Sequence, residues 1–136
     1  MFKRFFSVVL SFLFVAVVYF AVSTPVLSDF STELEVYSGK NSSESSITSL
    51  SKDQFFRVFN KTGESCVVSG VGVKEFFDYF DAQIVFVETT SEGVNYYGFS
   101  PRVKYVIDIN DKLINLHYFD GKDVDKVGSP IIFGSF

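Results

Sequence analysis

The stretch VKEFFDYFDAQIVFV, residues 73–87, contains the two hydrophobic periodicities that decide the fold. Its first part has apolar residues at i, i+3, i+4 and i+7, so residues 73–81 are predicted to form a short amphipathic helix. The residues with this spacing are Val73, Phe76, Phe77 and Phe80. Residues 84–87 are four consecutive apolar residues, a pattern typical of a central strand covered on both faces.

A hairpin is predicted further along the chain, where apolar residues alternate with more polar ones on both sides of Asn110-Asp111. A two-residue turn at these positions sets the register of the two strands. It places Ile107, Tyr105 and Lys104 opposite Ile114, Leu116 and His117, respectively. In this register His117 is predicted to lie on the solvated face, beside Asn115.

The other predicted elements are short and follow from alternation, capping residues and turn residues. They are a strand at 33–37, a Ser-rich loop at 38–51, a helix from 51 to about 60, strands at 65–68 and 95–99, a loop at 120–126 and a last strand around 131–133. The sequence therefore predicts one α+β domain over residues 32–136. We expect an antiparallel sheet of about five or six strands with two short helices on one face.

Residues 5–22 contain no charged side chain and follow Lys3 and Arg4. As a helix this run is about 27 Å long, close to the roughly 30 Å hydrocarbon core of a bilayer. The two basic residues favour a cytoplasmic N-terminus, so the domain is expected outside the membrane. Residues 24–31 are interpreted as a linker.

Two fates of residues 1–23 stay open from the sequence alone. The run is longer than the hydrophobic region of an ordinary signal peptide, which favours an uncleaved single-pass anchor in the cell membrane. The small residues Ala21 and Ser23, however, offer a cleavage site after Ser23. Cleavage there would produce a secreted protein, and either fate makes the domain extracytoplasmic.

The charge balance argues against a nucleic-acid-binding protein. Without Lys3 and Arg4, the domain and linker carry ten basic and sixteen acidic residues, a net charge of −6. Nucleic-acid binding requires Lys and Arg set against phosphate, and no basic cluster is evident. We therefore predict the membrane, through residues 5–22, and an unidentified protein as partners.

The candidates for chemistry are the single cysteine, Cys66, and the single histidine, His117. Cys66 precedes two valines and is interpreted as a small core residue, since free cysteine is among the most buried residue types. No nucleophile motif surrounds it. Residues 120–125 resemble a calcium loop but lack the required Asp and Glu positions. We predict no catalytic residues, no metal site and no cofactor; a small hydrolase using Cys66 or His117 is the alternative.

Four residues around one strand end, Tyr96, Tyr97, Phe99 and Arg102, are of the types that anchor protein interfaces. They are the candidate interaction surface, with ordinary sheet packing as the other interpretation.

The segments YGFSP (97–101), INLH (114–117) and VGSPII (127–132) resemble the closing part of the YwmB family. Its members are exported proteins of spore-forming Gram-positive bacteria with a fold like the TATA-box-binding protein. The resemblance covers residues 97–136 and implies a curved antiparallel sheet with helices against one face. It also implies a link to sporulation, and it supplies no catalytic residues. Together these observations predict a non-enzymatic interaction module of the bacterial cell envelope.

Overall fold

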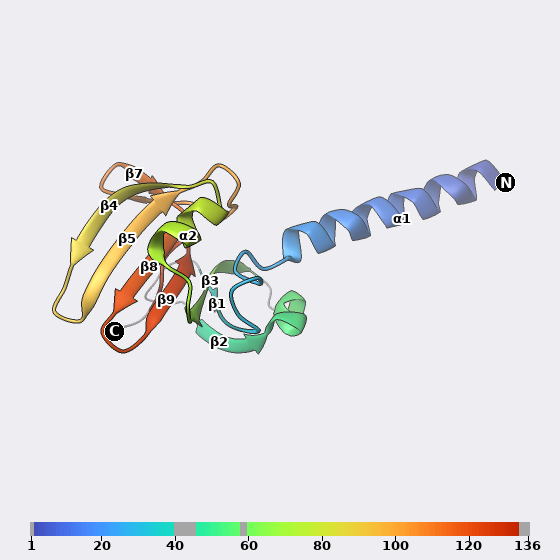
Figure 1. The fold of residues 1–136 in the computed structure, drawn as a ribbon. Helices are drawn as coiled ribbons and strands as arrows, with labels where there is room; N and C mark the ends of the chain where they lie inside the picture. The colour runs from blue at the N-terminus through green and yellow to red at the C-terminus, as the bar shows by residue number, and fades with distance from the viewer. Residues whose placement is uncertain (1, 40–45, 58–59, 134–136) are drawn as a thin grey trace.

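The computed structural model describes residues 2–39, 46–57 and 60–133 and consists of one long helix followed by an α+β domain (Figure 1). The predicted fold class is therefore confirmed. In chain order the elements are α1 (Phe2–Ser23), β1 (Glu33–Ser38), β2 (Ser46–Ser51), the 3₁₀ helix η1 (Lys52–Arg57), β3 (Lys61–Val68), α2 (Val73–Tyr79), β4 (Gln83–Thr89), β5 (Gly93–Phe99), β6 (Ile107–Ile109), β7 (Lys112–Ile114), β8 (Leu116–Gly121) and β9 (Asp125–Ser129).

Seven strands form one antiparallel sheet in the order β2-β1-β3-β9-β8-β5-β4, and β6 pairs with β7 separately. The sequence predicted five or six strands. The difference arises mainly because β2 lies in the Ser-rich stretch predicted to be a loop. Its hydroxyl side chains do not prevent pairing, since β2 bonds to β1 over six residues. Residues 40–45 of the predicted loop lie outside the described residues.

The hydrophobic core lies between one face of this sheet and the two short helices. Phe76 and Phe77 of α2 and Phe55 of η1 are buried in the same cluster, and α2 confirms the helix predicted at 73–81. The other predicted helix, from 51 to about 60, is only the 3₁₀ helix η1, and its residues 58 and 59 lie outside the described residues. The cluster also contains Leu27, Leu34, Val36, Cys66, Val68, Phe80, Val103, Leu116, Tyr118 and Val127. Side-chain alternation along the strands directs the strand residues of this cluster to the helix side, and Leu27, Phe80 and Val103 join it from the connecting segments.

The predicted hairpin is correct only next to its turn. Ile107 lies opposite Ile114 as predicted, and Asn110 and Asp111 both have positive φ angles, as a type I′ turn requires. The predicted continuation of the register to Leu116 and His117 is wrong. The chain bends at Asn115 and enters β8, which pairs with β5 and β9 instead.

Asn115 fixes this bend through main-chain hydrogen bonds. Its side-chain nitrogen donates to the carbonyl oxygens of Ser100, at 2.5 Å, and Val103, at 3.2 Å, while its oxygen accepts from Ser100 N at 2.8 Å. The Asn115 side chain is fully buried, so these bonds compensate its loss of water.

β8 and β9 form a hairpin where a loop over residues 120–126 was predicted. That prediction rejected a tight turn because it would place acidic residues beside Tyr118. The rejected two-residue turn at Asp120-Gly121 is indeed absent: Tyr118 lies opposite Val127, and residues 122–124 join β8 to β9. The predicted last strand around residues 131–133 is wrong, because the final strand is β9 and the segment 130–133 leaves the sheet.

β4 was predicted to be a central strand and is instead the edge of the sheet. Its side chains are apolar on both faces, but Ile84 and Val87 remain 44% and 51% exposed. The strand's position depends on long-range pairing with β5, which local pattern does not specify.

α1 extends away from the domain, and none of its apolar window from Lys3 to Phe20 is buried (Figure 1). It is long and apolar enough to cross a membrane or to act as a signal sequence. The hydroxyls of Ser11 and Thr24 donate to carbonyl oxygens four residues earlier, both at 2.9 Å. Such bonds satisfy polar groups within the helix itself, as a hydrocarbon environment demands.

Candidate functional site

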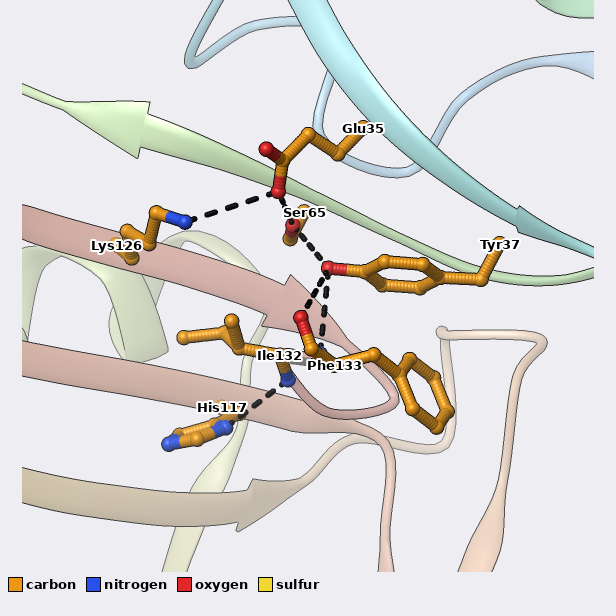
Figure 2. Close-up of polar contacts among 7 residues, drawn as sticks. All are labelled: Glu35, Tyr37, Ser65, His117, Lys126, Ile132 and Phe133. Atoms are coloured by element: carbon orange, nitrogen blue, oxygen red, sulfur yellow. Dashed lines mark hydrogen bonds and ion pairs between the residues drawn. The ribbon is translucent and has the colours of Figure 1, made fainter. Parts of the chain in front are cut away.

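The sheet face opposite α2 carries a group of polar side chains that strand alternation brings together from four strands (Figure 2). We call it the polar face and define it by Glu35, Tyr37, Ser65, His117 and Lys126. The segment 130–133 lies across it.

A continuous chain of polar contacts crosses the polar face (Figure 2). Lys126 Nζ lies 3.7 Å from Glu35 Oε2, and the Ser65 hydroxyl donates to the same oxygen at 3.1 Å. The Tyr37 hydroxyl is hydrogen-bonded to Ser65 and accepts from Phe133 N at 3.2 Å. The chain of contacts thus ties the segment 130–133 to the sheet.

Two glycines allow that close approach. A Cβ atom on Gly128 would lie 2.7 Å from both Ile131 C and Ile132 N, and one on Gly63 would lie 2.7 Å from Ser129 O. Real Cβ atoms do not approach main-chain atoms so closely, so the segment 130–133 can pack here only because positions 63 and 128 are glycines.

His117 is buried at 2% exposure, so the predicted solvated position is wrong. Its Nδ1 accepts a hydrogen bond from Ile132 N at 3.1 Å, which assigns the ring proton to Nε2, and Nε2 then donates to Asn95 Oδ1 at 2.8 Å. Burial lowers the pKa of His117 to about 3. The imidazole is therefore neutral at physiological pH, and both nitrogens are occupied by structural contacts.

His117 also ends a row of stacked rings that crosses three strands. Tyr97 stacks on His117 with ring centres 4.4 Å apart, and Phe86 stacks on Tyr97 at 4.3 Å. Lys112 Nζ lies 5.3 Å from the centre of the Phe86 ring, within cation–π range. The row connects the buried histidine to the exposed edge at β4.

Cys66 lies on the other side of the sheet from His117. The two residues occupy β3 and β8, on either side of β9, where Cys66 is opposite Val127 and His117 is opposite Gly128. Val127 and Gly128 are consecutive in β9, so they face opposite sides of the sheet. Residues that lie opposite each other on neighbouring strands share a face, so Cys66 and His117 point to opposite sides. Cys66 is buried as predicted, and burial raises the pKa of its thiol to about 12. The structure does not bring the thiol and the imidazole together.

The four residues predicted as an interaction surface do not share one face. Tyr97 faces away from α2 and is stacked as described, whereas Tyr96, the next residue, packs against the core. Phe99 is partly buried and Arg102 is exposed in the loop that follows. Alternation along β5 separates the two tyrosines, which accounts for the division.

The segment after α1, interpreted from the sequence as a linker, packs into the domain. Leu27 is fully buried, and its main-chain N–H donates to Glu64 Oε1 at 2.5 Å. Lys104 Nζ donates to Thr24 O at 2.8 Å. The Phe30 ring contacts Phe76, Tyr79 and Phe80 with ring centres 5.0–5.7 Å apart. We call residues 24–30 the docked segment.

Glu64 is a fully buried carboxyl group on the core side of β3. Burial raises its pKa to about 7, against the lowering effects of the Leu27 N–H and of Lys104. Its Oε2 atom has no hydrogen-bond partner among the described residues. Sequence analysis missed Glu64 because the strand was predicted to begin at Ser65; alternation extended back from Cys66 would have placed it in the core.

A cavity of about 670 Å³ opens where the docked segment meets the domain. Its charged lining residues are Asp29, Arg102 and Lys104, and Asp29 accepts a hydrogen bond from the Tyr79 hydroxyl. Within the described residues no group of three or more His, Cys, Asp or Glu side chains could hold a metal ion.

Compared with protein-family models, curated proteins and solved structures, the chain matches none of them. The resemblance to the YwmB family therefore stays a prediction.

Proposed function

We propose that the chain is a membrane-anchored, extracytoplasmic and non-enzymatic module of the bacterial cell envelope that binds a protein partner. The observation that carries the proposal is the uncovered apolar surface of α1. Phe12 and Phe14, for example, are 73% and 70% exposed, and no described residue of the domain covers them. Such a surface is stable only in an apolar surrounding, and a lipid bilayer provides one of matching thickness.

The energy of insertion supports a membrane-spanning role for α1. Thirteen Phe, Val and Leu residues between positions 5 and 22, at about −0.3 to −0.6 kcal/mol each, favour insertion by roughly 4 to 8 kcal/mol. Lys3 and Arg4 precede the helix, and the next basic residue is Lys40. This asymmetry favours a cytoplasmic N-terminus and an external domain.

The docked segment supports an anchor that positions the domain. Residues 24–30 are held by the bonds of Glu64 and Lys104 and by the packing of Leu27 and Phe30. The domain is thus joined to the helix without a free linker. A module held in this way presents the same surfaces at a fixed height above the membrane, which suits binding to a defined neighbour.

The environments of Cys66 and His117 support a non-enzymatic role. Their side chains lie on opposite faces of the sheet, and both are buried in their neutral forms. A nucleophile and base must come within hydrogen-bond distance of each other to act together. The hydrolase alternative therefore has no such pair in the described part of the chain, and the link to sporulation rests on the YwmB resemblance alone.

The intact mass of the protein recovered from membranes tests the anchor. We expect the full chain from Met1, resistant to alkaline extraction. The double variant Leu13→Arg/Val17→Arg should lose membrane association, because two charges at the helix centre cost about 5 to 7 kcal/mol, close to the whole insertion energy. Leu13→Val/Val17→Leu is the matched control and should remain anchored. A mature protein that begins at Thr24 would show that α1 is a cleaved signal.

The binding role requires a separate experiment. The anchored chain should be crosslinked in intact cells and purified with its neighbours, in parallel with a chain that carries an unrelated apolar helix in place of residues 5–22. We expect the same crosslinked species with both anchors, since binding belongs to the domain. Complete absence of crosslinked species would argue against an interaction module.

A further inference from the structure

The outer edge of β4 combines unpaired main-chain groups with apolar side chains. β4 ends the sheet and pairs with β5 on one side, and no strand of the described chain pairs with its other side. Edge strands of soluble proteins usually carry Lys or Pro residues that prevent pairing with other chains. Gln83–Thr89 contains neither, and it exposes Ile84 and Val87. Its composition is that of an interior strand.

The opposite edge of the sheet is different. Four of the six residues of β2 are Ser or Thr, and η1 packs beside it. β2 exposes one large apolar side chain, Ile47, whereas β4 exposes both Ile84 and Val87, so the apolar surface is more extensive at β4.

We propose that β4 pairs with β4 of a second copy of this chain, antiparallel and centred on Val87. Two-fold symmetry then places Val87 opposite Val87, and Phe86 opposite Glu88 of the second copy. Phe86 and Glu88 lie on the same face of the sheet, as directly opposed residues must. The register uses the regular end of the strand, beyond the irregularity between Ile84 and Phe86.

Charge complementarity favours a second copy as the occupant. Glu88 is the one charged residue of β4 and does not lie opposite itself in this register. Lys112 Nζ lies over the Phe86 ring, 5.3 Å from its centre. Since Phe86 faces Glu88 of the second copy, Lys112 comes beside that carboxylate. The symmetry generates the same Lys112–Glu88 pair twice.

The position of β4 determines how the two copies meet. η1 contacts both α1 and β2, so α1 joins the domain at the β2 end of the sheet, and Figure 1 shows β4 at the far end. Pairing about a two-fold axis at β4 directs the two α1 helices away from each other. If the helices are membrane anchors, which rests on the proposed function, the pairing connects copies anchored in facing membranes.

Disulfide crosslinking of the full chain in detergent tests the register without requiring a membrane. Directly opposed residues of antiparallel strands have Cα atoms about 4.5–5.5 Å apart, within the range of a disulfide. Val87→Cys should therefore form a dimer under mild oxidation. The matched control is Ile84→Cys, similarly exposed on the same strand, whose two copies would lie roughly 20 Å apart and should not crosslink. Both variants share the buried Cys66.

A charge exchange between two populations of proteoliposomes tests the pairing across membranes. Glu88→Lys places lysines beside Lys112 of an identical copy, and Lys112→Glu places glutamates beside Glu88, so neither variant should pair with itself. A mixture restores both ion pairs. We expect wild-type vesicles to cluster, each variant alone to cluster at least about tenfold less, and the mixture of the two to cluster again.

The outcomes separate this proposal from the membrane anchor. Flotation of the protein with the vesicles measures anchoring independently of clustering. Equal crosslinking of Val87→Cys and Ile84→Cys, or none at Val87→Cys, would overturn the β4 pairing even if the protein floats with lipid. Clustering of either variant alone to the wild-type extent would overturn it as well.

Discussion

Replacing Glu64 by Gln should change how the stability of the protein depends on pH. Glu64 is fully buried, and its Oε1 accepts the Leu27 N–H that holds the docked segment. Gln keeps an oxygen acceptor for Leu27 and cannot ionise. The substitution therefore removes the cost of a buried carboxylate while it preserves the contact.

The magnitude follows from the raised pKa of Glu64. Below about pH 4.5 the carboxyl group is protonated in both the folded and the unfolded chain, so it adds no pH dependence there. As the pH rises from 4.5 through the folded-state pKa of about 7, the folded chain binds more protons and the free energy of unfolding falls. The total fall amounts to about 3 kcal/mol. Lys61 and Lys104, which favour the charged form, limit it.

The assay is urea denaturation of the detergent-solubilised full chain, followed by tyrosine circular dichroism from about pH 5 to pH 8. Because the other titrating groups are shared, the difference between wild type and Glu64→Gln isolates this carboxyl group. The variant should gain about 2.5 kcal/mol relative to wild type between pH 5 and pH 8, because part of the total fall occurs below pH 5. Parallel pH profiles for the two proteins would refute the buried-carboxylate argument.

Three further predictions concern the two sides of the sheet. Gly128→Ala should destabilise the protein by about 1–3 kcal/mol in the same denaturation assay, because its Cβ would meet Ile132 N, whereas Gly72→Ala, with open space around it, should have little effect. Nitrogen NMR should find His117 neutral, with its proton on Nε2, down to about pH 4.5, since its pKa is lowered to about 3 by burial; an imidazolium signal at that pH would contradict the assignment. Cys66 should resist maleimide in the folded protein and react after unfolding, because its thiol is buried and its pKa is raised.

Patterns confined to neighbouring residues predicted the structure well. The helix at α2 follows from apolar spacing, and the Asn110-Asp111 turn correctly sets Ile107 opposite Ile114. Both depend on interactions within a few residues, where the side-chain period and turn geometry decide the conformation.

Pairings between distant segments could not be obtained in the same way. The hairpin register fails beyond Ile114 because Asn115 bonds to residues 100 and 103, which lie 12 to 15 positions away. Likewise, an apolar run such as that of β4 is compatible with a central strand and with an edge strand that exposes apolar side chains. Only the order of the strands distinguishes the two, and that order is set by the complete sheet.

The burial of polar residues explains the errors at the candidate site. His117 was predicted to be solvated because it is polar and alternates with apolar neighbours, yet the segment 130–133 covers it and satisfies its Nδ1. Glu64 is likewise buried by the docked segment. In both cases the polar side chain is buried by an irregular segment from a distant part of the chain, and no local sequence pattern predicts that this segment packs there.

The most direct test of the anchored, external domain is labelling of Ser91→Cys in intact cells with a membrane-impermeant maleimide. Ser91 is exposed in the turn between β4 and β5, and the native Cys66 is buried and should not be labelled. We predict that the cysteine at position 91 is labelled before lysis and that the labelled protein sediments with the membranes. Labelling only after lysis, or labelled protein in the medium, would contradict a membrane-anchored module outside the cytoplasm.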